Sequence, residues 1–209
     1  MDFFAIFISS FVIALSGAMM PGPLLTATIG ESSQRGFLAG PLLIAGHGIL
    51  ELLLLAALGL GLAPFLRRDD VFVVVAIAGG FILLWMAIGM FRALPSLTLS
   101  LKTEGMKRGS LVWNGAVLSI ANPYWIIWWA TIGLGYLMYS WKYGLAGIAV
   151  FFAGHILADF AWYVTISAVI GKGRHLFSNK LYRGIIAVCA AGLVVFAGYF
   201  FYAGLQKLV

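Results

Sequence analysis

Two pairs of a histidine and an acid share the same local sequence in this chain. His47 and Glu51 lie in Ala-Gly-His-Gly-Ile-Leu-Glu, and His155 and Asp159 lie in Ala-Gly-His-Ile-Leu-Ala-Asp. Because each histidine precedes its acid by four residues, a helix would place the two side chains one turn apart on one face. The carboxylate could then fix the imidazole tautomer or share its proton, and histidine changes charge near neutral pH. If the faces of the two pairs converge, two imidazoles and two carboxylates surround one cavity near the middle of the membrane, which suits a proton, an ammonium group or a metal ion.

Both pairs lie inside long apolar runs of sequence. An acid at bilayer depth costs about 2.5 to 3.5 kcal/mol, and such residues usually face a protein interior or a water-filled path. This cost favours a role in handling a substrate or a proton. The alternative is structural, with each histidine satisfied by its own acid so that the pair only holds helices together.

Helix-breaking residues precede each pair. Pro21, Gly22 and Pro23 stand ahead of the first, and Asn122 and Pro123 stand ahead of the second. Proline removes a backbone donor and clashes with the preceding turn, while glycine tolerates unusual dihedral angles. At membrane depth an interrupted helix is tolerated where it is buried or lines a cavity, and the amino terminus of a half-helix attracts an anionic group. The alternative for either breaker is a kink or a packing hinge.

A zwitterionic amino acid would meet donors at the breakers and acceptors at Glu51 and Asp159. Trp125 and Trp129 lie four residues apart, just after the second breaker, and are candidates for contact with a cation. Most of the other aromatic residues fit interfacial belts. Hydroxyl or amide contacts could come from three further residues, each of which is more often helix-packing glue: Thr26, Ser119 and Asn122.

The elements that position these residues are membrane spans. The chain has 209 residues, of which 63% are hydrophobic and 10% charged, unlike an ordinary soluble domain. Six apolar runs are long enough to cross a bilayer, at about 3–28, 40–66, 71–94, 111–139, 145–170 and 184–205. Loops are expected between them, the first at 31–35. The sequence therefore predicts an all-α integral membrane protein with six transmembrane helices.

The basic residues predict an orientation. The 13 lysines and arginines lie between apolar runs, without the interleaved aromatics of a nucleic-acid surface, so no nucleic-acid partner is expected. Nine of the 13 fall on one side of the six spans, namely Arg35, Arg92, Lys102, Lys107, Arg108, Lys172, Arg174, Lys180 and Arg183. That side should be cytoplasmic, which leaves both termini extracytoplasmic in a multi-pass protein of the plasma (inner) membrane.

The chain also repeats itself. A breaker, the Ala-Gly-His-x3-acid motif and a glycine-rich third helix occur twice in that order. Because three is odd, the second copy must cross the membrane in the opposite sense, as in many secondary transporters. We expect one transmembrane domain over residues 1–209, with repeat one at about 1–95, a cytoplasmic loop at about 95–110 and repeat two at about 111–209. The alternative is a chance match, since glycine and alanine recur in all membrane helices. Small-residue faces in the third and sixth spans would permit a homodimer.

These features resemble the lysine exporter (LysE/RhtB) family of amino-acid export proteins over nearly the whole chain. The resemblance rests on six hydrophobic segments, a long basic connection after the third, and the residues Pro21, Gly22, Pro23, Gly40, Gly46, Gly48, Asn122 and Pro123. It implies export of amino acids or similar metabolites from the cytoplasm, commonly in exchange with an ion gradient.

The leading hypothesis is a secondary active exporter of amino acids or related small metabolites, coupled to protons or another ion through the two pairs. The alternative is a divalent metal cation exporter that uses His47, Glu51, His155 and Asp159 as ligands. An enzyme is not expected, because the chain has three histidines and no G-x-S-x-G elbow. No cofactor is expected either.

Overall fold

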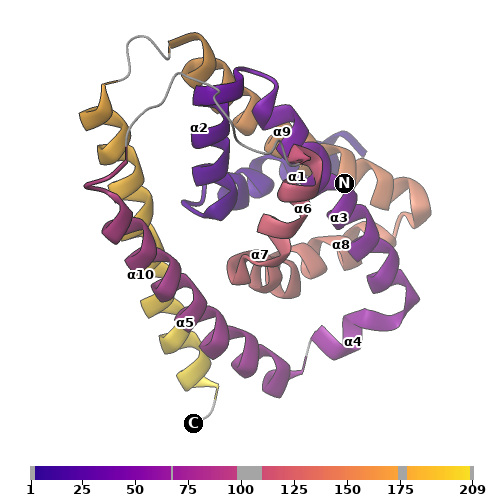
Figure 1. The fold of residues 1–209 in the computed structure, drawn as a ribbon. Helices are drawn as coiled ribbons and strands as arrows, with labels where there is room; N and C mark the ends of the chain where they lie inside the picture. The colour runs from indigo at the N-terminus through magenta and orange to yellow at the C-terminus, as the bar shows by residue number, and fades with distance from the viewer. Residues whose placement is uncertain (1–2, 67, 98–109, 174–177, 208–209) are drawn as a thin grey trace.

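The computed structural model describes residues 3–66, 68–97, 110–173 and 178–207, and these fold into helices without strands (Figure 1). Four helical segments are long and apolar enough to cross a membrane. They are α3 (Ala39–Ala57) with its continuation to Leu62, α5 (Asp69–Ala93), α9 (Gly144–Gly173) and α10 (Asn179–Gln206). Two bent pairs raise the number of spans to as many as six. The prediction of an all-α membrane protein is confirmed.

The first bent pair forms at the first breaker. Helices α1 (Phe3–Ala18) and α2 (Pro23–Arg35) meet at 80°. Pro23 occupies the first turn of α2, where its missing N–H costs nothing, and Gly22 before it is extended. The loop expected at 31–35 was wrong, because α2 continues through it. A pair between Arg35 and Glu31 (2.7 Å) supports this turn, and Gly36 ends the helix with a φ of 79°.

The second bent pair forms at the second breaker. Helices α6 (Leu111–Ile120) and α7 (Pro123–Trp128) belong to segments that meet at 65°. The Asn122 side chain caps α7 by accepting a hydrogen bond from the Tyr124 amide (3.2 Å). The chain then passes through a π-helical turn, Trp129–Gly133, into α8 (Leu134–Trp141). The short α4 (Ala63–Leu66) joins α3 to the segment before α5.

Glycines bring the central helices into close contact. A Cβ atom on Gly46 of α3 would overlap the Val112 carbonyl of α6, and one on Gly154 of α9 would lie 2.5 Å from the Phe7 carbonyl oxygen of α1. Only glycine permits such an approach. Since His47 and His155 directly follow these glycines, the two crossings fix the positions of both histidines.

Helices α5 and α10 lie antiparallel along one edge of the molecule (Figure 1). Lys207 binds Asp69 at one end (2.6 Å), and the Arg183 guanidinium donates to the Leu97 carbonyl at the other (2.7 Å). Some of the small residues expected on a dimer face pack within the chain instead. Gly80 of α5, for example, lies against the Phe201 ring of α10. The predicted loop at 95–110 lies largely outside the described residues.

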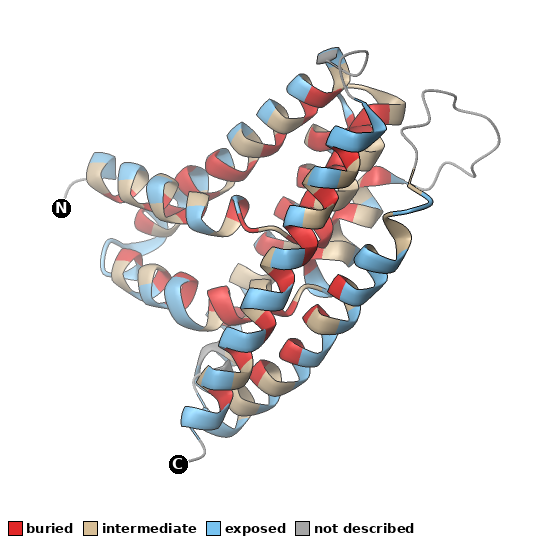
Figure 2. Ribbon diagram, turned by 90° about the vertical axis from the view of Figure 1, so that its left-hand side faces the viewer, coloured by how far each residue is buried: buried red, intermediate tan, exposed pale blue. Residues whose placement is uncertain are grey.

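The distribution of polarity is that of a membrane protein. Large apolar side chains point outward, with Leu60 90% and Trp85 74% exposed. Glu51 and Asp159 are buried instead, and buried residues line the faces where the helices meet (Figure 2). An apolar outer surface suits contact with lipid, while ionisable side chains within the spans lie in the interior.

Candidate functional site

The two histidine and acid pairs converge between α3 and α9. The Glu51 Oε1 atom lies 3.1 Å from His47 Nε2 and 3.0 Å from His155 Nε2. Asp159 Oδ2 lies 3.4 Å from His155 Nε2 and 3.7 Å from His47 Nε2. Each acid therefore contacts both imidazoles. The sequence predicts that each acid contacts its own histidine and that the two pairs share one cavity, and the structure brings all four side chains together and adds the specific contacts between the two pairs.

Glu51 lies at the centre of this cluster and is 1% exposed. Its Oε1 atom accepts hydrogen bonds from the indole N–H groups of Trp129 (2.9 Å) and Trp125 (3.2 Å). Trp129 begins the π-helical turn, an insertion that shifts helix register and often occurs at functional sites. Both tryptophans thus reach the site, but they present N–H edges to an anion, whereas the sequence favoured ring faces toward a cation.

Ser119 also contacts the site, although the sequence favoured a role in helix packing for this residue. Its hydroxyl lies 2.8 Å from His47 Nδ1 and donates to the Gly115 carbonyl (2.7 Å). The hydroxyl is therefore hydrogen-bonded to His47 Nδ1, and the other ring nitrogen, Nε2, faces Glu51 and Asp159. The signal in the sequence was the position of Ser119 one turn before the second breaker.

A cavity of about 50 Å³ lies beside these side chains. Gly22 and Asn122 line it, so one residue from each breaker reaches the site. The prolines lie elsewhere: Pro21 lies against Gly192, Pro23 borders a groove beside α5, and Pro123 contacts Gly79. Among the described residues that line the cavity, two are acids and none is lysine or arginine.

Several buried polar atoms at the site have no hydrogen-bond partner. They are Glu51 Oε2, His155 Nδ1 and Asp159 Oδ2. A buried polar atom without a partner costs about 1 to 3 kcal/mol. Their concentration at one point, within a helical membrane protein, indicates a site built for something other than packing.

Ionisable residues in a buried cavity between interrupted membrane helices define a membrane transport protein. A family model for the LysE type translocator matches residues 15–204. The chain therefore belongs to the LysE family of translocators, which makes it an export protein in general terms.

One relative aligns over nearly its full length. The chain is 26% identical over 205 residues to the chemotactic transduction protein ChpE of Pseudomonas aeruginosa, covering 93% of this chain and 96% of ChpE. No solved structure matches this chain.

Proposed function

We propose that this protein exports amino acids or related small metabolites from the cytoplasm and couples their export to protons. The observation that carries the proposal is the convergence of His47, Glu51, His155 and Asp159 beside a cavity that both helix breakers reach. Membership of the LysE family supports an exporter.

The substrate ammonium group would bind the carboxylates of Glu51 and Asp159. Its carboxylate would bind at the breakers, where Gly22 offers no side chain to cap α2 and leaves the first amides of that helix for another partner. Asn122 fits the same role. Its Oδ1 accepts from the Tyr124 amide, and its NH₂ group lies beside Gly22 at the cavity wall. Trp125 and Trp129 would orient Glu51 for this contact.

Proton coupling would follow from the continuous contacts among the four ionisable groups. Glu51 touches both imidazoles, and Asp159 lies near both. An arriving ammonium group would displace a proton shared between an acid and a histidine, because both cations use the same carboxylate oxygens. Substrate and proton would then alternate at the site.

The chain would consist of two inverted repeats within one transmembrane domain, at about 1–95 and 111–209 on either side of a cytoplasmic loop. Two features support this arrangement. Gly46 of the first half packs on α6, while Gly154 of the second half packs reciprocally on α1. Helices α5 and α10, the third of each half, run antiparallel. Inverted halves would place the site at their interface.

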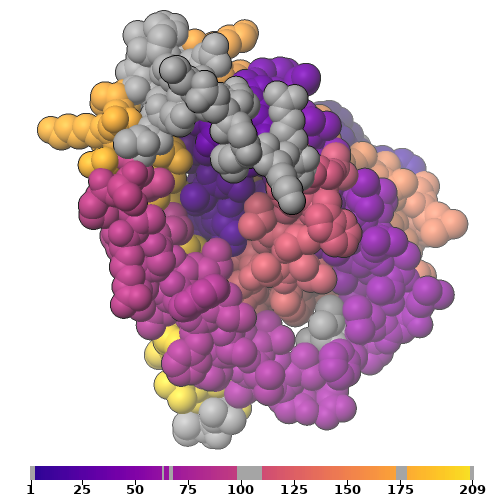
Figure 3. Space-filling model, in the orientation of Figure 1, coloured from indigo at the N-terminus to yellow at the C-terminus, as the bar shows by residue number. Residues whose placement is uncertain are grey.

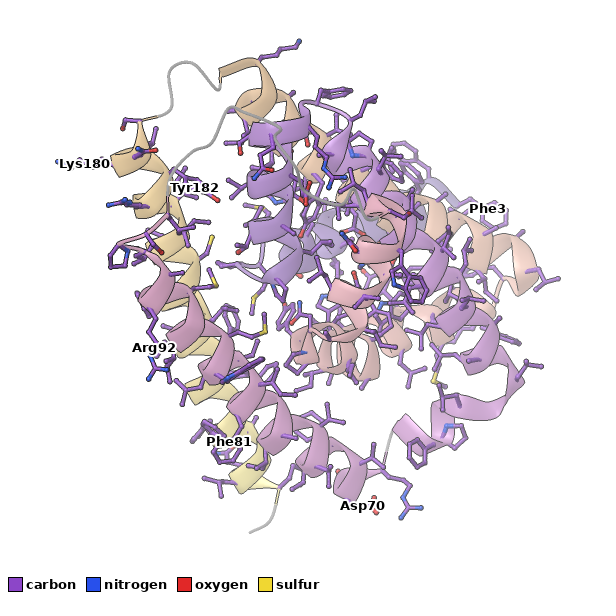
Figure 4. All side chains as sticks on the ribbon, in the orientation of Figure 1. Phe3, Asp70, Phe81, Arg92, Lys180 and Tyr182 are labelled. Carbon is purple, nitrogen blue, oxygen red and sulfur yellow. The ribbon has the colours of Figure 1, made fainter. Side chains whose placement is uncertain are left out.

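The protein would lie in the plasma membrane with both termini outside. Lys180 lies near one end of the α5 and α10 pair and Asp70 near the other (Figure 4). The end with Lys180 is the one with the excess of basic residues and would be cytoplasmic. A homodimer remains a proposal, based on outward-facing glycines such as Gly198.

The test is a proteoliposome screen of labelled amino acids under an imposed pH gradient. Glu51→Gln and Asp159→Asn keep the side-chain shape and remove the charge, so each should abolish acceleration by the gradient. If both variants transport as fast as the natural protein, the acids are structural and the assignment of the site is wrong.

A further inference from the structure

The spacing of four buried atoms matches the ligand shell of one metal ion. The ligand atoms of His47, Glu51, His155 and Asp159 all lie within 4.8 Å of one another. Their nitrogen to oxygen contacts run from 3.0 to 3.7 Å. Ligands about 2.0 to 2.1 Å from a tetrahedral ion lie roughly 3.3 Å apart. The four nitrogen to oxygen contacts are thus close to the tetrahedral spacing, and the widest separation, up to 4.8 Å, would shorten by about 1.5 Å when an ion binds.

The contacts behind these atoms orient them for an ion. The Ser119 hydroxyl is hydrogen-bonded to His47 Nδ1, which leaves Nε2 of the same ring directed at Glu51 and Asp159. Metal-binding histidines are typically fixed in this way through their second nitrogen. The indoles of Trp125 and Trp129 fix the Glu51 carboxylate by donating to it. Two carboxylates and two imidazole nitrogens that face one another repel unless a proton or a metal cation lies between them.

Charge balance favours a divalent ion. Two carboxylates and two neutral imidazoles carry a charge of −2, which one divalent cation cancels, and a neutral site is far less costly in a buried environment. Asp159 Oδ2, which accepts no hydrogen bond, would become a ligand of the ion. The cavity of about 50 Å³ admits a bare ion in the conformation described. Imidazole and four-coordination suit Zn²⁺ and Co²⁺, whereas Mg²⁺ and Ca²⁺ require more oxygen ligands.

We propose that His47 Nε2, Glu51 Oε1, His155 Nε2 and Asp159 Oδ2 bind one divalent transition-metal ion in a tetrahedral site within the membrane. This goes beyond the proposed amino-acid export, since it concerns binding and holds whether or not the protein carries amino acids. It gives the metal-cation alternative raised by the sequence a specific geometry. Because the same oxygens would bind an ammonium group, the ion and an amino acid would exclude one another.

The test uses the full-length protein, purified in detergent, stripped with a chelator and titrated with Co²⁺. We expect one equivalent of Co²⁺ per chain, with the intense visible absorption of tetrahedral Co²⁺, and no displacement by excess Mg²⁺. The double variant His47→Ala with His155→Ala should lose the signal, while His175→Ala, at the third histidine, should keep it. Ser119→Ala should weaken binding by about 10- to 100-fold and Ser119→Thr should restore it, because only the hydroxyl orients His47.

Absence of the tetrahedral signal in folded natural protein would overturn the proposal, as would a signal that persists in the double variant. If the double variant does not fold, the Ser119 pair still decides the matter, since equal binding by both of its members would contradict the site. Failure here is distinct from failure of the proposed function. Amino-acid export by chelated protein that binds no Co²⁺ would overturn only the metal site, whereas Co²⁺ binding without amino-acid export would overturn only the function.

Discussion

Replacing Gly154 by alanine tests whether the helix crossings position the site. The new Cβ would lie 2.5 Å from the Phe7 carbonyl oxygen, against an ordinary contact of at least 3.4 Å, so α1 and α9 must separate by about 0.9 Å. Overpacking typically costs about 1 to 3 kcal/mol. The gain in helix propensity from glycine to alanine offsets about 1 kcal/mol of this. The net loss of up to about 2 kcal/mol would lower Tm by up to about 8 °C.

The same shift should impair transport. His155 follows Gly154 and lies 3.0 Å from Glu51, so a displacement of about 0.9 Å carries the pair past the usual hydrogen-bond limit of about 3.2 Å. The matched control is Gly135→Ala in α8, where a Cβ meets nothing within 4 Å. Thermal unfolding followed by tryptophan fluorescence, together with uptake in proteoliposomes, should separate the two variants. Equal Tm values and equal transport would refute the link between the crossing and the site.

Three further predictions concern separate parts of the molecule. Trp129→Phe removes one of two indole donors to Glu51 and should slow proteoliposome transport several-fold, whereas Trp113→Phe, on a side chain that is 69% exposed, should leave the rate unchanged. Asn122→Ala removes the cap of α7 and should cost about 1 kcal/mol, visible as a lower Tm in detergent. In a Cys189→Ser background, a membrane-impermeant maleimide applied to intact cells should label Lys142→Cys, and it should label Lys180→Cys only after the membrane is opened.

The sequence could predict which residues gather at the site because an ionisable side chain inside an apolar run costs free energy of transfer into the membrane. Helix packing does not require that cost. Histidine and acid at a spacing of four, repeated after a breaker, placed all four ionisable side chains on facing helices. The contact between His155 and Glu51 could not be predicted, since it depends on the crossing of α3 and α9, which is set by close approaches such as that at Gly154. The π-helical turn that begins at Trp129 has no signature in the apolar pattern.

The boundaries of the first span were harder to predict than its interruption. Proline and glycine act locally, so the break near Gly22 follows directly from the residues. The length of α2 depends on two local features. The Glu31 and Arg35 pair continues the helix through charged residues that hydropathy assigns to a loop, and Gly36, with its positive φ, ends it. Hydropathy measures transfer into lipid and does not register a local ion pair.

The size of the cavity bears on how a substrate would reach the site. A cavity of about 150 Å³ is needed to hold benzene, and the 50 Å³ beside Glu51 is too small for most amino acids. Helices must therefore move before such a substrate binds. The helices should bend most easily at the breakers, because backbone hydrogen bonds are missing there. A groove of about 540 Å³ separates α2 and α6 from α5 (Figure 3), so little packing opposes a tilt of α2 on that side. Motion of α2 about Gly22 would widen the cavity while the glycine crossings at Gly46 and Gly154 keep the four ionisable side chains in place.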